Sequence, residues 1–360
     1  MNLINRLHTS QKHTVLCLED VGPLGARLPP DVDVVDLTRL VSRDHFFALR
    51  LAGVLRKLNP DIVHSRNWGC VDAVLAARLA GVPVSIHGEH GRDAIDPHGL
   101  NTRRRLFRRA LSPLVTRFVT VSDDLRRWLI EYVGIRAHRV VRIHNGVDID
   151  RFSVGSHDEG RAALGLAATD VVVGAVGRLD PVKDHATLLE AFARIANRPA
   201  NWKLVIIGEG ALRPQLEARI ARPDLDGSVH LIGERSNVPL LMKGLDLYVI
   251  SSVAEGISNT LLEAMSTGLP VVATRTGGNP ELVDEGTNGK LVAVGNADAM
   301  SAALNEYLGN ADLRTRDGRA SRQRVLDRFT LQRMADEYDR LYCSLSKRET
   351  ASTCAPAGER

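Results

Sequence analysis

Short β-branched runs alternate with longer helical patterns along most of the chain, and this alternation restricts the possible folds more than any other feature of the sequence. In the first half, strands are predicted at 13–19, 61–65, 83–88, 117–122 and 140–148. Helical patterns lie between them, for example at 46–58 and 69–81. Strands and helices that alternate in this way are typical of parallel sheets, so the sequence predicts the α/β class.

A second α/β set begins after a predicted boundary at 145–166, which has Asn-Gly turn chemistry followed by polar, glycine-containing sequence. Its strands are predicted at 170–178, 203–210, 228–234, 245–251, 269–275 and 290–295. A last helical pattern covers 330–342. At 360 residues the chain suits two domains of ordinary size. Ligands bind at the carboxyl ends of strands in open parallel sheets, so the residues of interest should directly follow strands.

The cysteine pattern indicates a reducing compartment. Four cysteines are scattered without a C-x-x-C pair, which disfavours a metal or disulfide framework; they are Cys17, Cys70, Cys343 and Cys354. No apolar run approaches the roughly 20 residues that span a bilayer, and residues 1–10 lack the apolar centre of a signal peptide. We therefore expect a cytoplasmic protein, at most peripheral to a membrane.

Positive charge is concentrated in the first half. Residues 1–150 hold 22 Lys and Arg against 16 Asp and Glu, so +6, and the remainder holds 25 against 27, so −2, which sum to +4. The densest cluster is RRRLFRRAL at 103–111, for which a solvated helix face and a contact with a membrane surface are both open. Nucleic acid is disfavoured as a partner because aromatic residues make up only 4% and no binding motif accompanies the charge.

The stretch EGISNTLLE at 255–263 combines loop and helix chemistry. Gly256 is a poor helix residue, whereas Ser258 and Asn259 are good N-caps ahead of a good helix start. The stretch therefore predicts a loop that carries Glu255, followed by a helix that carries Glu263. A helix N-terminus of this kind presents free N–H groups to an anion.

Two cations follow the predicted strand at 170–178. Arg178 and Lys183 lie on one loop beside a helix start, where they could hold a diphosphate without a divalent metal, although two ordinary surface cations would look the same. Gly208 and Gly210, after the next strand, allow close backbone approach. This pair lacks the third glycine of the dinucleotide fingerprint, so it is weak support for a dinucleotide site.

The order of these motifs resembles a known family. Residues 60–342 resemble the retaining glycosyltransferases of family 4, which have the GT-B fold. The resemblance is carried by the motifs GRL…K, IIGEG, GE…VP.LM…D.YV..S..EGISNTLLEAM and GLPVVAT..GG.PE, in this order. HSRNWG at 64–69 and SIHGEHGRD at 85–93 resemble more narrowly the bacterial sugar transferases of exopolysaccharide and exosortase systems.

The resemblance implies roles for the second half. Glu263 would accept hydrogen bonds from the ribose hydroxyls of a nucleotide, and Glu255 would lie near the donor sugar. Arg178 and Lys183 would neutralise the diphosphate leaving group. The remaining expected nucleotide-sugar-binding residues are Gly177, Gly208, Glu234, Arg235 (the last two beside the base), Gly256, Ile257, Ser258, Asn259 and Thr260.

In the first half, His87 matches best the family's strand-end histidine, which contacts the donor sugar, although a packed or capping histidine is the alternative. Glu89 and His90 are nearby candidates for the same role, and with Arg66 and Arg92 they are acceptor-side candidates. We therefore expect these five residues to line the first domain's side of the cleft.

The implied architecture is α/β GT-B, with two Rossmann-like domains that face each other across a cleft. We expect an acceptor-side domain at 1–146, a nucleotide-sugar domain at 147–328, a helix crossing back at 329–345 and a disordered tail at 346–360. Asn145, Gly146 and Asp148 match the family's interdomain linker, where a hinge is expected. The family usually opens with a strand and a Gly-Gly loop, so this chain looks truncated at its start, with a gap in the first domain.

The expected activity is transfer of a hexose from a nucleotide sugar, expected to be UDP-linked, to a glycan or lipid-linked acceptor in cell-surface polysaccharide synthesis. The resemblance implies retention by same-face attack, with no metal, no cofactor and no nucleophilic role for Glu255. The basic first domain could contact the cytoplasmic face of the inner membrane. The alternative is a non-catalytic nucleotide-sugar-binding protein or an inactive truncated copy.

Overall fold

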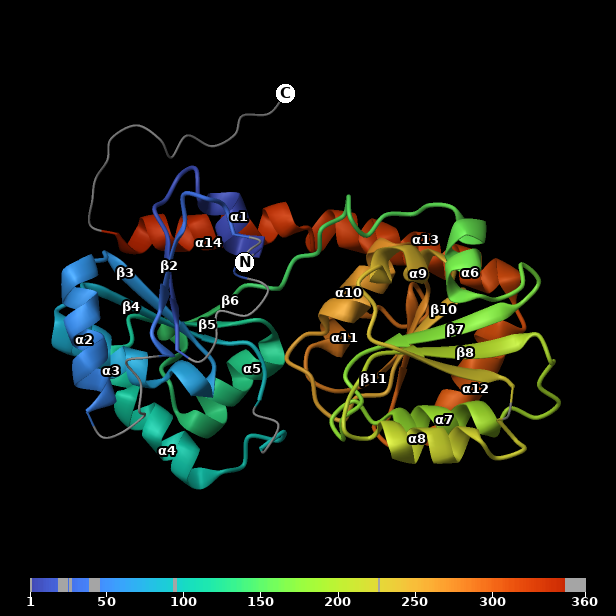
Figure 1. Ribbon diagram of the computed structural model, residues 1–360. Coiled ribbons are helices and arrows are strands. Elements are labelled where there is room, and N and C mark those ends of the chain that lie inside the picture. Colours follow the sequence, from blue (N-terminus) through green and yellow to red (C-terminus); the bar gives the residue numbers. More distant parts are fainter. Residues whose placement is uncertain are drawn as a thin grey trace.

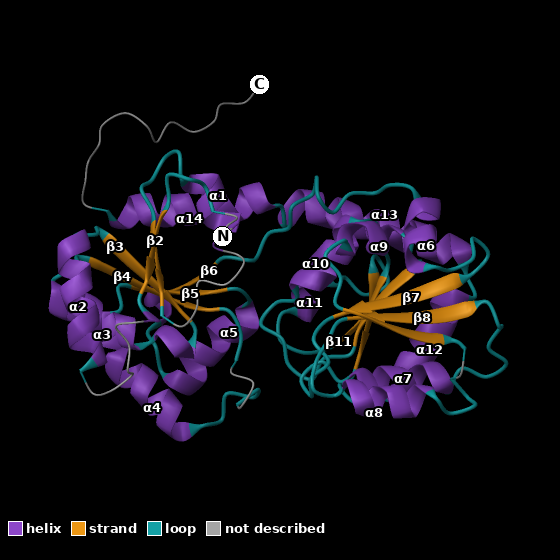
Figure 2. Ribbon diagram, viewed as in Figure 1, coloured by secondary structure: helices purple, strands orange, loops and turns teal. Residues whose placement is uncertain are grey.

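The computed structural model describes residues 2–18, 25, 28–38, 46–92, 96–225 and 227–346. It has two α/β halves side by side, with α13 (Ala311–Arg328) and α14 (Leu331–Leu345) running along one side of both (Figures 1 and 2). The fold class expected from the sequence is therefore confirmed. Of the tail expected at 346–360, everything from residue 347 lies outside the described residues.

The second half contains a six-stranded parallel sheet. Its strands are β7 (Val171–Val176), β8 (Trp202–Ile207), β9 (Val229–Gly233), β10 (Leu247–Ile250), β11 (Val271–Thr274) and β12 (Gly289–Val292). They are ordered β12-β11-β10-β7-β8-β9, all parallel. In this doubly wound order the strands after β7 are added on one side and those from β10 on the other, so the strand order reverses between β7 and β10. Every strand predicted in this half is present, with ends shifted by one to three residues.

Helices cover both faces of this sheet (Figure 2). Besides α13, they are α6 (His157–Leu164), α7 (His185–Ala193), α8 (Arg213–Ile220), α9 (Val238–Lys243), α10 (Asn259–Ser266), α11 (Asn279–Leu282) and α12 (Ala297–Leu308). Leu188, Leu304 and Tyr307 are buried with strand residues on one face, and Leu261 and Met265 on the other. Burial on both faces explains the nearly continuous apolar runs of these strands.

The first half contains two separate parallel sheets within the described residues. One pairs β1 (Thr14–Cys17) with β2 (Asp33–Asp36); the other has the order β3 (Ile62–Arg66), β4 (Val84–Glu89), β5 (Arg117–Thr120) and β6 (Val140–Arg142). Strand β2 was not predicted, because half of its residues are aspartates, which are depleted in strands.

The helices of the first half are α1 (Asn2–Leu7), α2 (Phe47–Leu58), α3 (Asp72–Ala80), α4 (Thr102–Leu111) and α5 (Asp123–Arg127), continued by the π-helical turn η5 (Trp128–Val133). The described residues also include three short 3₁₀ turns, η3 (Trp68–Cys70), η4 (Ser112–Leu114) and η6 (Ala137–Arg139).

Helix α14 belongs to the second half by sequence but packs on the first. Its buried Tyr338 and Tyr342 share a core with Ile86 of β4 and Val119 of β5. The Tyr342 hydroxyl lies 2.7 Å from Nδ1 of His64. The chain therefore crosses between the halves twice.

The two crossings lie against each other at one point. Val147 donates to the Phe329 carbonyl and accepts from the Leu331 amide, both at 2.9 Å. A Cβ at position 146 would lie 2.5 Å from the Thr330 carbonyl oxygen, so the close approach requires Gly146. The paired crossing lies at the linker where the sequence predicts a hinge, and the hinge itself stays a prediction.

Candidate active site

The reversal of strand order places two loops together at the carboxyl edge of the second sheet. One loop follows β7 and carries Arg178 and Lys183; the other follows β10 and carries Glu255. Ligands of doubly wound sheets bind outside the strand ends at this reversal. The topology thus joins residues 72 positions apart in the sequence at the place where a ligand would bind.

Lys183 and Glu255 form an ion pair at this edge. The Lys183 Nζ lies 2.6 Å from Oε1 of Glu255, and the Ser252 hydroxyl donates to the same oxygen at 2.7 Å. The Lys183 side chain is 21% exposed and that of Glu255 10% exposed. The pair is thus largely enclosed, and it holds the ammonium group at the strand ends.

Arg178 has a different environment. Its side chain is 76% exposed and pairs with Asp180 at 3.0 Å. The two cations predicted to act together therefore differ in exposure: the Lys183 side chain is held by Glu255, and the Arg178 side chain extends into solvent.

Glycines allow the loops of this edge to touch. A Cβ at position 208, where φ is +155°, would lie 1.9 Å from the carbonyl oxygen of Gly177. A Cβ at position 277, where φ is +52°, would lie 1.8 Å from the carbonyl oxygen of Glu255. No side chain fits either position, so backbone rather than side chains lines this part of the edge.

Helix α10 begins as its sequence predicts. Ser258 is the N-cap, and its hydroxyl accepts from the Leu261 amide at 3.2 Å. Ile257 is buried, whereas Asn259 is exposed and Thr260 is half-buried in the first turn. The first N–H groups of a helix lack intrahelical partners, so this turn presents donors and a positive dipole end beside Glu255.

Glu263 lies one turn into α10. Burial raises the pKa of its carboxyl group to about 7, against the opposing effect of Arg151. A carboxylate that is costly to ionise gains most from added hydrogen-bond donors. Tyr248, buried beneath α10, also has its pKa raised by burial, so its hydroxyl stays protonated.

Glu234 and Arg235 directly follow β9 and are exposed. Strand β9 forms one edge of the sheet, next to β8. These two residues therefore lie at the carboxyl edge as expected, to the side of Lys183 and Glu255.

His87 is buried in the first domain rather than exposed at its surface. Its side chain is 2% exposed, its Nδ1 lies 2.8 Å from the Ser65 hydroxyl, and its Nε2 lies 3.6 Å from Glu89 Oε1. Nδ1 is thus hydrogen-bonded, whereas Nε2 has no hydrogen-bond partner among the described residues. The expected contact with a donor sugar stays a prediction.

Glu89 and Arg108 form a buried ion pair beside His87. The Arg108 Nε donates to Glu89 Oε1 at 2.6 Å, and the guanidinium lies 4.7 Å from the ring centre of Trp68 and 5.2 Å from that of Trp128. Burial would raise the pKa of Glu89, but His87 and Arg108 outweigh it and lower that pKa. Glu89 was expected to face the acceptor side of the cleft. Instead its side chain is 1% exposed, and its carboxylate is paired with Arg108 inside the domain.

The other acceptor-side candidates lie at the ends of β3 and β4. Arg66 is exposed at the end of β3. The His90 amide donates to Asn67 Oδ1 at 2.9 Å, and burial, helped by Arg66, lowers the pKa of His90 to about 4, which keeps its ring neutral at pH 7. Arg92 pairs with Asp124 at 2.8 Å, so its charge is already partnered.

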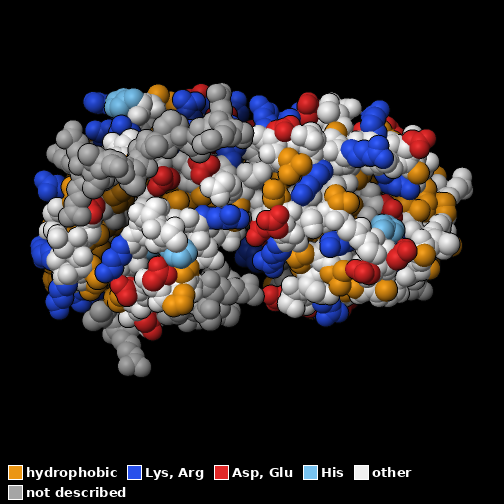
Figure 3. Space-filling view, turned by 90° about the horizontal axis from the view of Figure 1, so that it is seen from above, with side chains coloured by type: hydrophobic (Ala, Val, Ile, Leu, Met, Phe, Trp, Pro, Cys, Tyr) orange, Lys and Arg blue, Asp and Glu red, His pale blue; other side chains and the backbone are white. Residues whose placement is uncertain are grey.

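The strand-end loops of the two halves touch. A Cβ at position 256 would lie 2.2 Å from the carbonyl oxygen of His90, and one at position 278 would lie 3.0 Å from the Cβ of Ser122. Seen from above, the surface is hollowed between the two halves, and basic and acidic side chains gather there (Figure 3). The loops that follow β4 and β10 thus meet between the two halves.

Glu281 of α11 bridges the halves, and the sequence did not single it out. Its Oε1 accepts from the amides of Asp123 and Asp124 at 2.8 and 3.4 Å, and its Oε2 lies 2.8 Å from Nε2 of His144. It therefore caps α5 of the other half. The hydroxyl of Ser122, the N-cap residue of α5, caps the same helix end by accepting from the Leu125 amide. No local signal could have shown a contact across 158 residues.

Replacing Glu281 with alanine should loosen the contact between the halves. Two charge-assisted bonds and an ion pair are lost, so we expect the KM for the donor to rise about tenfold and the radius of gyration from X-ray scattering to increase. Glu285→Ala is the matched control, since the Glu285 carboxylate pairs with Arg275 on the exposed surface and does not bridge the halves. If both variants had the same KM and radius, Glu281 would not hold the halves together.

Within the described part of the chain, no group of three or more His, Cys, Asp or Glu side chains is placed to hold a metal ion. None of the described helices combines the length and apolar character needed to cross a membrane.

Two family models match the chain. The model described as Glycosyltransferase Family 4 matches residues 1–151, and the model described as Glycosyl transferases group 1 matches residues 170–310. Together they include both halves and every candidate residue named above.

Sequence relatives and solved structures agree with these models. A UDP-Gal:alpha-D-GlcNAc-diphosphoundecaprenol alpha-1,3-galactosyltransferase of Escherichia coli is 28% identical over 92% of this chain and 88% of its own length. The putative glycosyltransferase EpsF of Bacillus subtilis is 33% identical over 55% of this chain, which spans only about half of that relative (53%). The crystal structure of Anabaena Alr3699/HepE in complex with UDP has a TM-score of 0.80 and 23% identity, covering 95% of this chain and 94% of that one.

Proposed function

The chain belongs to glycosyltransferase family 4 and has the two-domain GT-B fold, and from that premise we propose that it transfers a hexose from a UDP-sugar to a glycan or lipid-linked acceptor. The observation that carries this proposal is the enclosed Lys183–Glu255 pair beside the start of α10, where the strand order reverses. A fixed cation and a helix N-terminus at one point suit a diphosphate.

The proposed chemistry rests on charge that develops on the leaving group. As the bond between sugar and diphosphate breaks, negative charge accumulates on the phosphate oxygens. Lys183 and the N–H groups of the first turn of α10 would stabilise that charge without a metal, since they are already fixed and need little reorganisation.

We propose that the reaction retains the anomeric configuration through attack on the face that the diphosphate leaves. In this mechanism Glu255 is not a nucleophile. Its Oε1 is engaged by Lys183 and Ser252, which supports a positioning role beside the sugar. The departing phosphate would take the proton of the acceptor hydroxyl.

The nature of the donor and acceptor is supported by the relatives. The Anabaena structure holds UDP, and the name of the Escherichia coli relative specifies a UDP-sugar donor and a diphosphoundecaprenol acceptor. We therefore propose a UDP-sugar and a lipid-linked acceptor for this chain, with a place in cell-surface polysaccharide synthesis at the cytoplasmic face of the membrane.

Helix α4 is the proposed membrane contact. Leu106 and Phe107 are 59% and 44% exposed among the arginines of this helix. Leu106→Glu should weaken binding to anionic vesicles about tenfold or more, since burial of one leucine is worth roughly 1.5–3 kcal/mol. Leu326→Glu, on exposed α13, is the control and should bind like the wild type. Equal binding by all three proteins would remove α4 from the proposal.

A panel of nucleotide sugars tests the proposed activity. With each sugar, release of the nucleoside diphosphate is measured with and without lipid-linked acceptors. A transferase releases UDP from at least one UDP-sugar. The second candidate, a non-catalytic nucleotide-sugar-binding protein, would bind UDP-sugars in calorimetry and release none.

Glu263 should make UDP binding depend on pH. With a pKa of about 7, its carboxyl is about half protonated at pH 7 before binding. Ribose hydroxyls donate to the ionised form, so binding lowers this pKa, releases about half a proton at pH 7 and strengthens from pH 6 to 8. Calorimetry in buffers of different ionisation enthalpy measures the release.

Glu263→Gln is the control, because its side chain has no proton to release while the phosphate groups of UDP titrate as before. We also expect Glu263→Ala to weaken UDP binding. Identical proton release by wild type and Glu263→Gln, or unchanged affinity of Glu263→Ala, would contradict the ribose assignment.

A further inference from the structure

A basic pocket lies at the edge of the first sheet opposite the cleft. Its lining comes from the segments that lead into β4, β5 and β6, and it has a volume of about 430 Å³. The carboxyl end of β4 meets the second half at Gly256, so the start of the same strand lies at the other edge. The pocket is therefore separate from the candidate active site.

The charge in this pocket is positive and unbalanced. Arg78, Arg117, His138 and Arg139 line it, and no Asp or Glu does. Among the described residues, no carboxylate lies within ion-pair distance of the three guanidinium groups. Arginine side chains gathered without acidic partners repel one another, which an anion in the pocket would relieve.

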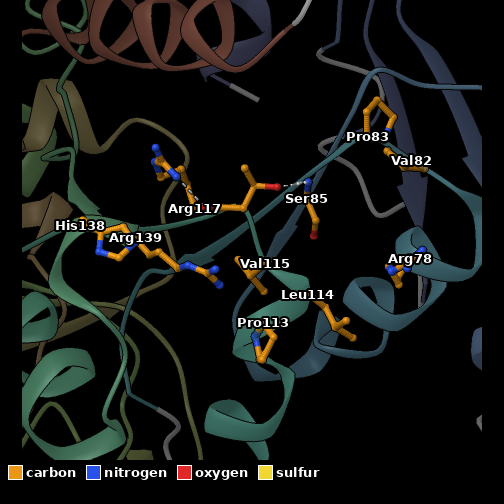
Figure 4. Close-up of a pocket in the computed structure, with 11 residues that line it drawn as sticks. Arg78, Val82, Pro83, Ser85, Pro113, Leu114, Val115, Arg117, His138 and Arg139 are labelled. Atoms are coloured by element: carbon orange, nitrogen blue, oxygen red, sulfur yellow. Dashed lines mark hydrogen bonds between the residues drawn. The ribbon is translucent and has the colours of Figure 1, made fainter.

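Part of this lining is already fixed. Nη1 of Arg139 donates to the Ser112 carbonyl at 3.0 Å, and Nη1 of Arg117 donates to the Thr116 carbonyl at 2.9 Å. Each guanidinium keeps further N–H groups for a ligand. In Figure 4 the guanidinium of Arg139 points into the space enclosed by the labelled residues.

Ser85 supplies an independent observation. Its side chain is 5% exposed, and among the described residues its buried hydroxyl has no hydrogen-bond partner. In Figure 4 it points toward the space between Arg139 and Arg78. A buried hydroxyl without a partner costs stability, and such groups are rare unless a bound group satisfies them.

We propose that this pocket binds a phosphate group, with Arg78, Arg117 and Arg139 as charge partners and Ser85 as a hydrogen-bond donor at its base. Its volume is in the range of small-molecule sites. The phosphate could belong to a soluble metabolite or to the headgroup of a membrane lipid. Either source gives the first domain an anion site distinct from that of the donor.

Inorganic diphosphate is the probe for this site, measured by calorimetry on the full chain. The Arg178→Ala/Lys183→Ala background removes the proposed donor-site cations, so the result does not depend on the proposed function. In that background, Arg78→Ala/Arg139→Ala should weaken diphosphate binding at least about tenfold. Arg319→Ala, an exposed arginine of α13, is the matched control and should leave binding unchanged.

Ser85→Ala separates binding from folding. Since its hydroxyl has no partner among the described residues, removal should leave the unfolding midpoint unchanged or slightly higher and still weaken diphosphate binding. Vesicles with phosphatidylglycerol, compared with phosphatidylcholine, identify the source: weaker binding by the pocket variants indicates a lipid headgroup, and unchanged vesicle binding indicates a soluble phosphate. Diphosphate binding that is absent, or equal in all variants, would overturn the proposal.

Discussion

Replacing Lys183 with alanine should lower the turnover number about 10²–10³-fold, the loss typical of removing one fixed group that stabilises charge in a transition state. Lys183 is the enclosed cation of the strand-end pair, held by Glu255 at 2.6 Å. The leaving diphosphate would lose this stabilisation in the transition state more than in the ground state, so turnover should fall further than donor affinity. Steady-state release of UDP measures both quantities.

The exposure of the two cations separates their effects. Arg178 is 76% exposed and can be screened by solvent, so Arg178→Ala alone should cost less than Lys183→Ala, and the double variant should be the least active. Lys290→Ala is the matched control, because Lys290 also pairs with a glutamate, Glu306, but on the open surface. Full activity in the double variant would refute the diphosphate role of both cations.

Replacing Arg108 with alanine should destabilise the first domain by about 3–5 kcal/mol, the usual cost of leaving one partner of a buried ion pair alone. Glu89 is 1% exposed and would lose its cation, while the two tryptophans would lose the side chain that lies between them. Protonation would then be the less costly state of Glu89, so its pKa should rise.

Urea unfolding followed by tryptophan fluorescence measures this effect, since two of the three tryptophans, Trp68 and Trp128, flank Arg108. Arg109→Ala is the matched control: it is the next residue on α4 and is exposed. A midpoint for Arg108→Ala equal to that of Arg109→Ala would show that the buried pair does not stabilise the domain.

Local chemistry explains what could be predicted from the sequence. The strands of the second half are buried on both faces, so their apolar runs are nearly continuous and easily recognised. Ser258 was predicted as an N-cap because its hydroxyl can satisfy an amide of the next turn, and it does so with Leu261. The Lys183 and Glu255 loops were predicted at strand ends, and the strand order brings them together.

Contacts between distant segments could not be predicted. Glu281 meets Asp123 and His144 only because the halves pack together, and no motif in the sequence encodes that distance. Glu89 was expected near an acceptor, yet Arg108 on the following helix draws it into the domain. A single sequence shows which residues follow a strand, but it does not show which way their side chains point.

A crystal structure with UDP bound tests the central claim most directly. The account predicts the diphosphate beside Lys183 and the first turn of α10, with the ribose hydroxyls donating to Glu263. UDP bound elsewhere, or bound in the cleft with its ribose away from Glu263, would contradict it.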